Sequence, residues 1–191
     1  MLSGKNIGFA ITGAFYGIEN VINEMSKLVM SEAEIIPIMS YYSYNIKSNI
    51  INSEDMINKI ENITGKHIIK SIEEAETIGH KYILDVMTII PCTGNTIAKF
   101  ANGIADTAVL VAAKAHLKRE KPLVIGIATS DGLSNNAENI GKIMNKKNVY
   151  LVPFRQDNPL TKPYSLRFDI NYTSKTIISA LDNKQIQPIL L

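Results

Sequence analysis

The sequence predicts an α/β fold of three layers, in which a parallel sheet lies between two layers of helices. Short β-type runs alternate along the chain with amphipathic segments of helical period. The run at residues 123–129 is apolar without interruption, as expected for a strand buried on both faces of a parallel sheet. The length of 191 residues, without internal repeats or linkers, predicts one domain over residues 1–191.

The predicted strands are short apolar runs that end at glycine, proline or polar residues. Pro37 places the second of them at an edge of the sheet or at a bulge, because proline cannot donate a ladder hydrogen bond. Pro91 ends the third. In chain order, the five predicted strands are residues 5–12, 34–39, 82–90, 123–129 and 149–154.

The predicted helices repeat apolar residues at helical spacing, and Ser53 is the N-cap of the second one. They are residues 16–30, 53–63, 71–78, 93–105, 108–117, 134–145 and 173–182. Two segments without periodicity are predicted as loops. The first, 41–52, contains three tyrosines that would cover a flat ligand or form a subunit contact. The second, 155–166, would be a lid or an interface to a partner.

Composition argues against several classes of function. The formal charge is +2, from 20 Lys+Arg and 18 Asp+Glu without a dense basic block, which argues against salt-driven nucleic-acid binding. One cysteine and three histidines without an HExxH pair predict no disulfide and no metal site. No apolar run approaches the ~18 residues of a membrane span, so we expect a soluble cytoplasmic protein.

Four predicted strand ends carry small or hydroxyl side chains, which let backbone N–H groups approach an anion. They are residues 12–15, Ser40, 91–96 and 129–132. Any one such turn is explained without a ligand, because a strand-to-helix connection commonly contains glycine and a serine or threonine N-cap. Four at one sheet edge predict a phosphate-bearing ligand. The first turn is neither GxGxxG nor a P-loop, so neither a classical NAD fingerprint nor an ATP cradle is supported.

The most specific signal is PCTGNTIAKFANGIAD at residues 91–106. It resembles the Pro-Ala-Ser/Thr-Ala-Asn-Thr signature of the flavoprotein family of flavin-dependent cysteine decarboxylases, and Ile11-Thr12-Gly13-Ala14 resembles the family's first turn. The resemblance spans nearly the whole chain. It implies a Rossmann-like three-layer αβα fold, a single flavoprotein-like domain and a flavin mononucleotide (FMN) site.

The resemblance also implies which residues form that site. The flavin phosphate would contact Thr12, Gly13, Ala14 and Phe15, with Ser40 nearby. The ring or the substrate would be flanked by Pro91, Thr93, Gly94, Asn95 and Thr96, with Ser130 also at the cofactor. Asn95 would be a catalytic hydrogen-bonding group.

A narrower likeness within the family rests on the Thr-Gly-Asn-Thr form of the motif and on PFRQDNP at residues 153–159. It implies an oxidoreductase subunit that acts with a nicotinamide-binding partner carrying NADP, in the mother cell of a sporulating bacterium, and a homo-oligomer. The substrate would be a small dicarboxylate ring that loses a hydride and a proton. Lys99, Arg155 and Lys162 are the candidate carboxylate-binding residues, and Asp131 and Asp157 the candidate bases.

Two alternatives stay open. The first is an FMN-dependent decarboxylase of the phosphopantothenoylcysteine decarboxylase type, although the family's Pro-x-Met-Asn clamp is replaced here by residues 128–133. The second is a scaffold subunit that has lost flavin, because Ala14-Phe15 replaces a commoner turn hydroxyl. His80 is expected to be structural or solvated, and Cys92 a buried thiol.

Overall fold

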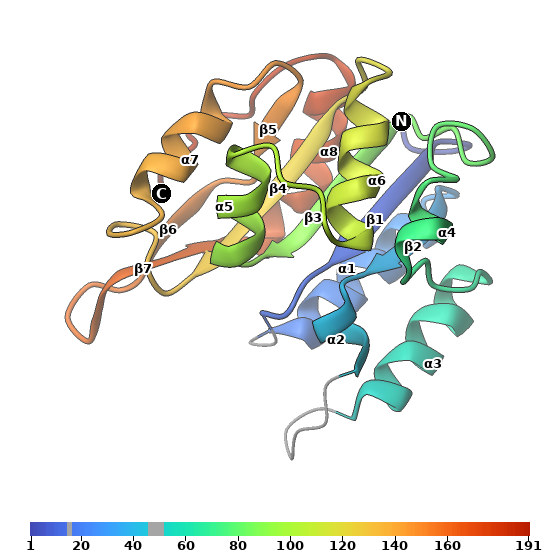
Figure 1. Cartoon of the computed structure of the whole chain (residues 1–191), viewed down its shortest axis with the longest axis horizontal. Helices are drawn as coiled ribbons and strands as arrows, with labels where there is room; N and C mark the ends of the chain where they lie inside the picture. The colour runs from blue at the N-terminus through green and yellow to red at the C-terminus, as the bar shows by residue number, and fades with distance from the viewer. Residues whose placement is uncertain (15–16, 46–51) are drawn as a thin grey trace.

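The computed structural model describes residues 1–14, 17–45 and 52–191, which form a seven-stranded sheet covered by helices on both faces (Figure 1). The strands are β1 (Asn6–Ile11), β2 (Glu34–Met39), β3 (Val86–Cys92), β4 (Leu123–Thr129), β5 (Val149–Leu151), β6 (Phe154–Asn158) and β7 (Lys162–Phe168). The helices are α1 (Ile18–Met30), α2 (Tyr41–Asn45), α3 (Ser53–Thr64), α4 (Ile72–Ala75), α5 (Gly94–Ala101), α6 (Ala108–Leu117), α7 (Ala137–Met144) and α8 (Thr173–Leu181), with a short 3₁₀ helix at Ile170–Tyr172. The predicted α/β class and its three layers are confirmed.

The sheet is mixed, however, and not wholly parallel. Strands β2, β1, β3 and β4 lie side by side and parallel, with β2 at the edge as Pro37 predicts. The first half of β4 pairs with β5, also parallel, and its last two residues pair antiparallel with β7. The sheet then ends with β6, antiparallel to β7.

The prediction of a loop over 155–166 was therefore wrong, because β6 and β7 form a hairpin there (Figure 1). Pro159 and Pro163 hid the strand pattern, but Leu166 and Phe168 alternate with more polar neighbours and pack against the core. The loop predicted at 41–52 begins as the short helix α2, and residues 46–51 lie outside the described part.

Other boundaries shift by a few residues. The third strand begins at Val86 and not at Tyr82, and it continues through Pro91 to Cys92. The predicted strand 149–154 divides into β5 and the start of β6. The predicted helix 134–145 begins at Ala137, which leaves Asn136 in the turn before it.

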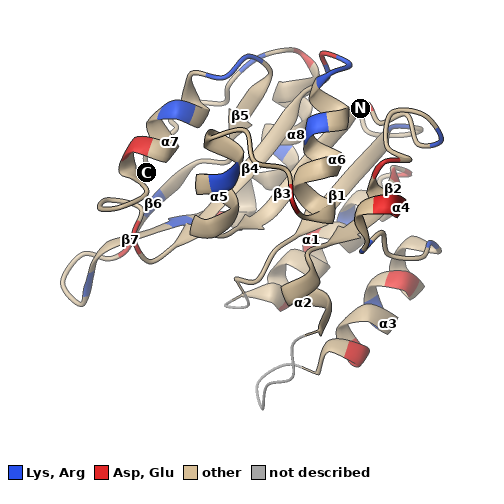
Figure 2. Ribbon diagram, viewed as in Figure 1, with Lys and Arg blue, Asp and Glu red and all other residues tan. Residues whose placement is uncertain are grey.

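Two hydrophobic clusters fill the spaces between the layers. One lies under α5, α6 and α7 and contains Phe100, Val109 and Ile143. The other lies under α1, α3 and α8 and contains Met25, Ile60 and Ile177. Charged side chains of both signs are spread over the elements, with acidic residues on α3 and α4 (Figure 2). In the described part of the chain, no helix is both long and apolar enough to cross a bilayer.

His116 lies on the buried face of α6, where it is 1% exposed and its Nε2–H donates to the carbonyl oxygen of Pro122 at 2.9 Å. Burial lowers the pKa of His116 below its usual value. Because the unfolded chain binds this proton more readily, the contribution to stability is present above the unfolded pKa of ~6.5 and is lost as the pH falls below it.

We expect His116→Gln, which keeps a donor for Pro122 without a titrating group, to lose less unfolding free energy than the wild type between pH 7.5 and pH 5. Urea unfolding at both pH values measures this difference. An equal loss in the two proteins would show that His116 does not titrate on unfolding in this range.

Candidate functional site

The carboxyl ends of β1, β2, β3 and β4 meet at one edge of the sheet because the four strands are parallel. The ends of β1 and β3 are joined through Thr12, which is 1% exposed. Its hydroxyl donates to the carbonyl oxygen of Pro91 at 2.8 Å and accepts from the backbone N–H of Thr93 at 3.0 Å. The two predicted turns are thereby held together.

The end of β2 is tied to the same place by two buried serines. Ser43 Oγ lies 3.1 Å from the carbonyl oxygen of Ile11, to which it donates, and 2.9 Å from Ser40 Oγ. Ser40 therefore uses its hydroxyl within the protein. The ring of Tyr42 lies over Gly13, where an added Cβ would be 2.4 Å from Tyr42 Cδ1. Only a glycine at position 13 allows this close approach.

The start of α5 carries the most specific motif. Thr93 is its N-cap and accepts from the backbone N–H of Thr96, while the two threonine hydroxyls lie 3.0 Å apart. Gly94 faces the end of β4 so closely that a Cβ would lie 2.5 Å from Thr129 Oγ1 and 3.0 Å from Asp131 Oδ1. The side chain of Asn95 is exposed at this turn.

Asp131 is held by donors from two directions. Thr129 Oγ1 donates to its Oδ1, and Asn136 Nδ2 lies 2.9 and 3.0 Å from its two carboxylate oxygens. The hydrogen bond from Thr129, supported by that from Asn136, lowers the pKa of Asp131 below its usual range. The carboxylate is ionised at neutral pH.

Two pockets lie beside these turns, and Arg167 lines both of them. One, of about 240 Å³, is lined by Ala14, Ala128, Thr129, Ser130, Asp157, Lys162, Ser165, Leu166, Arg167 and Phe168. The other, of about 370 Å³, shares Asp157, Arg167 and Phe168 and adds Arg155 and the start of α1. Asp157 pairs with Lys162 at 3.1 Å and with Arg167 at 3.7 Å. Lys162 and Arg167, both paired with Asp157, line the smaller pocket.

The structure brings most of the predicted residues to this edge but not all of them. Lys99 lies on the exposed side of α5, where its ammonium group pairs with Asp106 at 2.7 Å. Arg155 pairs with Asp169 at 3.5 Å in the larger of the two pockets. Phe15 lies outside the described residues. Cys92 is fully buried, and burial raises the pKa of its thiol, as expected for an inert core cysteine.

Sequence reasoning missed Arg167, Ser43 and Asn136. Arg167 sits on β7, whose alternation with Leu166 and Phe168 was a readable signal in the sequence. Ser43 and Asn136 follow strand ends in polar segments, and no sequence pattern separates them from ordinary turn residues.

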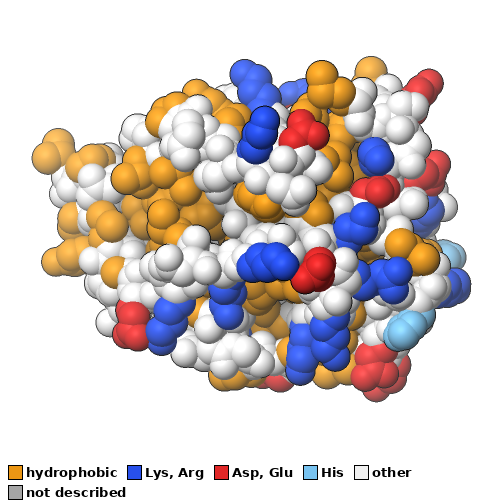
Figure 3. Space-filling model, turned by 90° about the horizontal axis from the view of Figure 1, so that it is seen from above, with side chains coloured by type: hydrophobic (Ala, Val, Ile, Leu, Met, Phe, Trp, Pro, Cys, Tyr) orange, Lys and Arg blue, Asp and Glu red, His pale blue; other side chains and the backbone are white. Residues whose placement is uncertain are grey.

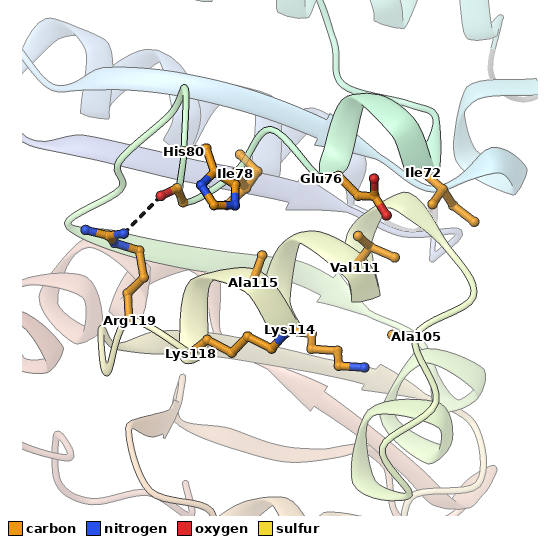
Figure 4. Close-up of a pocket in the computed structure, with 11 residues that line it drawn as sticks. Ile72, Glu76, Ile78, His80, Ala105, Val111, Lys114, Ala115, Lys118 and Arg119 are labelled. Atoms are coloured by element: carbon orange, nitrogen blue, oxygen red, sulfur yellow. Dashed lines mark hydrogen bonds between the residues drawn. The ribbon is translucent and has the colours of Figure 1, made fainter.

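A third pocket, of about 720 Å³, lies away from this edge, between α4, the turn at Gly79 and α6 (Figure 4). Lys114, Lys118 and Arg119 line it together with apolar side chains, and Arg119 donates to the carbonyl oxygen of Gly79 at 3.0 Å. His80 lines this pocket, whereas none of the residues predicted to bind flavin or substrate does.

The residues at the carboxyl edge fit a flavin mononucleotide in their chemistry. Small side chains and hydroxyls line the smaller pocket, and Arg167 supplies positive charge for a phosphate. Asn95 adds an exposed amide that can donate to a ring carbonyl and accept from a ring N–H. Among the described residues, no group of three or more His, Cys, Asp or Glu side chains could hold a metal ion.

Gly94→Ala tests the packing between α5 and the end of β4. We expect it to destabilise the fold by about 1–3 kcal/mol, because the new methyl group would displace Thr129, Asp131 and Asn136. Gly141→Ala is the matched control, since a methyl group there meets nothing within 4 Å and should stabilise α7 by about 0.5–1 kcal/mol. Urea unfolding compares the two; a neutral Gly94→Ala would contradict the packing.

Comparison with known proteins agrees with this geometry. A family model described as Flavoprotein matches residues 1–165. The chain is 39% identical over 190 residues to the B subunit of dipicolinate synthase from Bacillus subtilis (strain 168), covering 100% of this chain and 95% of that protein. A crystal structure of the B subunit of dipicolinate synthase from Bacillus halodurans C superposes with a TM-score of 0.91 at 40% identity, covering 100% and 97% of the two chains.

More distant structures share the fold. The FMN-dependent cysteine decarboxylase SpaF has a TM-score of 0.68 at 18% identity, covering 95% of this chain and 98% of that one. The family-model match over residues 1–165, together with the full-length relative, shows that the chain belongs to the flavoprotein family.

Proposed function

We propose that the chain acts as a dipicolinate synthase B subunit, which works with a nicotinamide-binding A subunit carrying NADP to oxidise dihydrodipicolinate to dipicolinate. The observation that carries the proposal is the full-length likeness to a protein of that name, together with the polar carboxyl edge described above. The oxidation removes a hydride and a proton from a ring that bears two carboxylates. FMN, when bound, would supply an acceptor for the hydride.

The chain's own residues would hold the two ligands at the carboxyl edge. The Thr12–Ala14 turn, Ser130 and the Pro91–Thr96 turn would surround the flavin, with Thr93 and Thr96 keeping the α5 turn in shape. Lys162 and Arg155 would bind the substrate carboxylates, and Arg167 adds a further cation between their two pockets. An Arg fork matches a carboxylate in two parallel hydrogen bonds.

Asn95 and Asp131 are the groups that we assign to the reacting centre. They belong to facing turns, since Gly94 beside Asn95 packs directly against Asp131. Lys99, which the resemblance also implied, stays a prediction; its ion pair with Asp106 favours a surface role.

Assembly and location complete the proposal. We expect a homo-oligomer in the cytoplasm of the mother cell, as the likeness implies. Exposed apolar side chains provide surface for contacts between copies: Met144 on α7 is 48% exposed and Leu190 is 65% exposed. Figure 3 shows apolar side chains gathered over the end of the molecule that carries α7 and the C-terminus.

The proposal is tested by measuring dipicolinate formation from freshly generated dihydrodipicolinate with NADP⁺. The A subunit is assayed alone and with this chain, each with and without FMN. We expect product only when both chains are present. Activity of the A subunit alone would contradict the proposal, and release of carbon dioxide from a cysteine conjugate by this chain alone would favour the decarboxylase alternative.

Asn95→Ala should lower the kcat of the two-subunit mixture at least about tenfold, because a hydrogen bond to the reacting centre worth about 1.4 kcal/mol is lost. Asn135→Ala, at an exposed position in the turn before α7, is the control and should leave kcat unchanged. Equal rates for both variants would indicate a scaffold without a working flavin site.

Lys162→Met should raise the KM for dihydrodipicolinate about tenfold with little change in kcat, because a cation that binds substrate and transition state alike is lost. Lys147→Met removes a lysine from a comparable surface ion pair, with Glu120 at 2.9 Å, and should have no effect. Steady-state kinetics decide between these outcomes, and an unchanged KM would remove Lys162 from the substrate site.

A further inference from the structure

A chain of hydrogen bonds through three asparagine side chains connects Asp131 to the molecular surface. Asn136 Nδ2 donates to both carboxylate oxygens of Asp131, and Asn139 Nδ2 donates to Asn136 Oδ1 at 3.0 Å. Asn102 Nδ2 then donates to Asn139 Oδ1 at 3.2 Å, and the ammonium group of Lys142 donates to Asn102 Oδ1 at 3.3 Å. The chain crosses from the turn after β4 over α7 to the end of α5.

The two ends of this chain fix its direction. An ammonium group only donates hydrogen bonds and a carboxylate only accepts them. Each amide must therefore turn its NH₂ group toward Asp131 and its oxygen toward Lys142, and the aligned bonds reinforce one another. An isolated asparagine could turn its amide over, whereas Asn136 in this chain cannot do so without breaking bonds at both of its ends.

The inner end of the chain is shielded and tightly packed. Asn136 is 5% exposed, and its Nδ2 lies 2.7 Å from where a Cβ on Gly94 would be. The lysines near the hydrogen-bond chain form ion pairs with carboxylates other than Asp131. Lys142 pairs with Glu138 at 2.8 Å, and Lys162 pairs with Asp157. Among the residues that the structure describes, Asp131 is thus fixed by the neutral donors Thr129 and Asn136 and forms no ion pair.

We propose that Asn136, Asn139 and Asn102 form a positioning chain that holds Asp131 as a permanent anion beside the Gly94–Asn95 turn, so that Asp131 is not the proton acceptor of the site. Asn136 is the positioning residue, because it alone of the three contacts Asp131. The catalytic consequence rests on the proposed function: the ring proton must pass to a group other than Asp131.

The hydrogen-bond chain is tested by titrating Asp131 in protein labelled with ¹³C-aspartate, without flavin or partner subunit. The carboxyl resonance of Asp131 is identified as the one that disappears in Asp131→Asn. Asn136→Leu keeps the number and branching of the side-chain heavy atoms and removes the two N–H donors of Asn136, so the titration midpoint of Asp131 should rise by about one pH unit. Asn139→Leu breaks the next link at a half-buried site and should give a smaller rise. Asn135→Leu, at an exposed neighbouring position, should give none.

An unchanged titration midpoint of Asp131 in both Asn136→Leu and Asn139→Leu would overturn the proposal of a positioning chain. If Asn136→Leu does not fold, the result for Asn139→Leu decides alone. The role of Asp131 is tested by the acid limb of kcat/KM in the two-subunit assay. We expect the pH at which kcat/KM falls to be the same in Asn139→Leu as in the wild type, while the titration midpoint of Asp131 rises. If the two rise together, Asp131 is the proton acceptor. A two-subunit mixture that forms no dipicolinate would refute the proposed function, whereas the titration of Asp131 would still test the hydrogen-bond chain.

Discussion

The buried hydroxyl of Thr12 is the point on which the arrangement of the candidate site depends. It donates to one backbone group of the β3 turn and accepts from another, and so joins the ends of two central strands with one side chain. The carbonyl oxygen of Pro91 also accepts from the backbone N–H of Thr12 at 3.3 Å, whereas the N–H of Thr93 relies on the hydroxyl, so losing that bond would cost about 1–3 kcal/mol. The start of α5, which carries Gly94 and Asn95, is positioned by this link.

The rest of the edge is built outward from that link. Ser43 ties the end of β2 to Ile11, the last residue of β1, and Gly94 brings the start of α5 against the end of β4. Three turns that are far apart in sequence thus share one surface, and each is held by at least one contact that a side-chain change would break. Turns fixed in this way suit a site that must hold two ligands in a defined orientation to each other.

The sequence predicted the strands of the parallel core well, because their apolar runs are buried on both faces and need no long-range information to be recognised. It did not predict the hairpin, where Pro159 and Pro163 interrupt a strand pattern that only pairing with β4 completes. The predicted turn residues do gather at one edge. Their individual roles were not readable: the hydroxyls of Thr12, Ser40 and Thr93 bond to the protein itself, and Asn136 looks like any turn asparagine until Asp131 is seen beside it.

Strand β4 has different neighbours along its length, and this affects how the site can change in evolution. Its first half pairs with β5 inside the core, whereas only Ala128 and Thr129 pair with the hairpin that supplies Lys162 and Arg167. The wall of the pocket is therefore hydrogen-bonded to β4 through two residues, while Leu166 and Phe168 anchor it in the core. Substitutions at the polar positions of this one hairpin, such as Lys162 and Arg167, would change the charge of the pocket while the core packing and the turns at the other strand ends stay as they are.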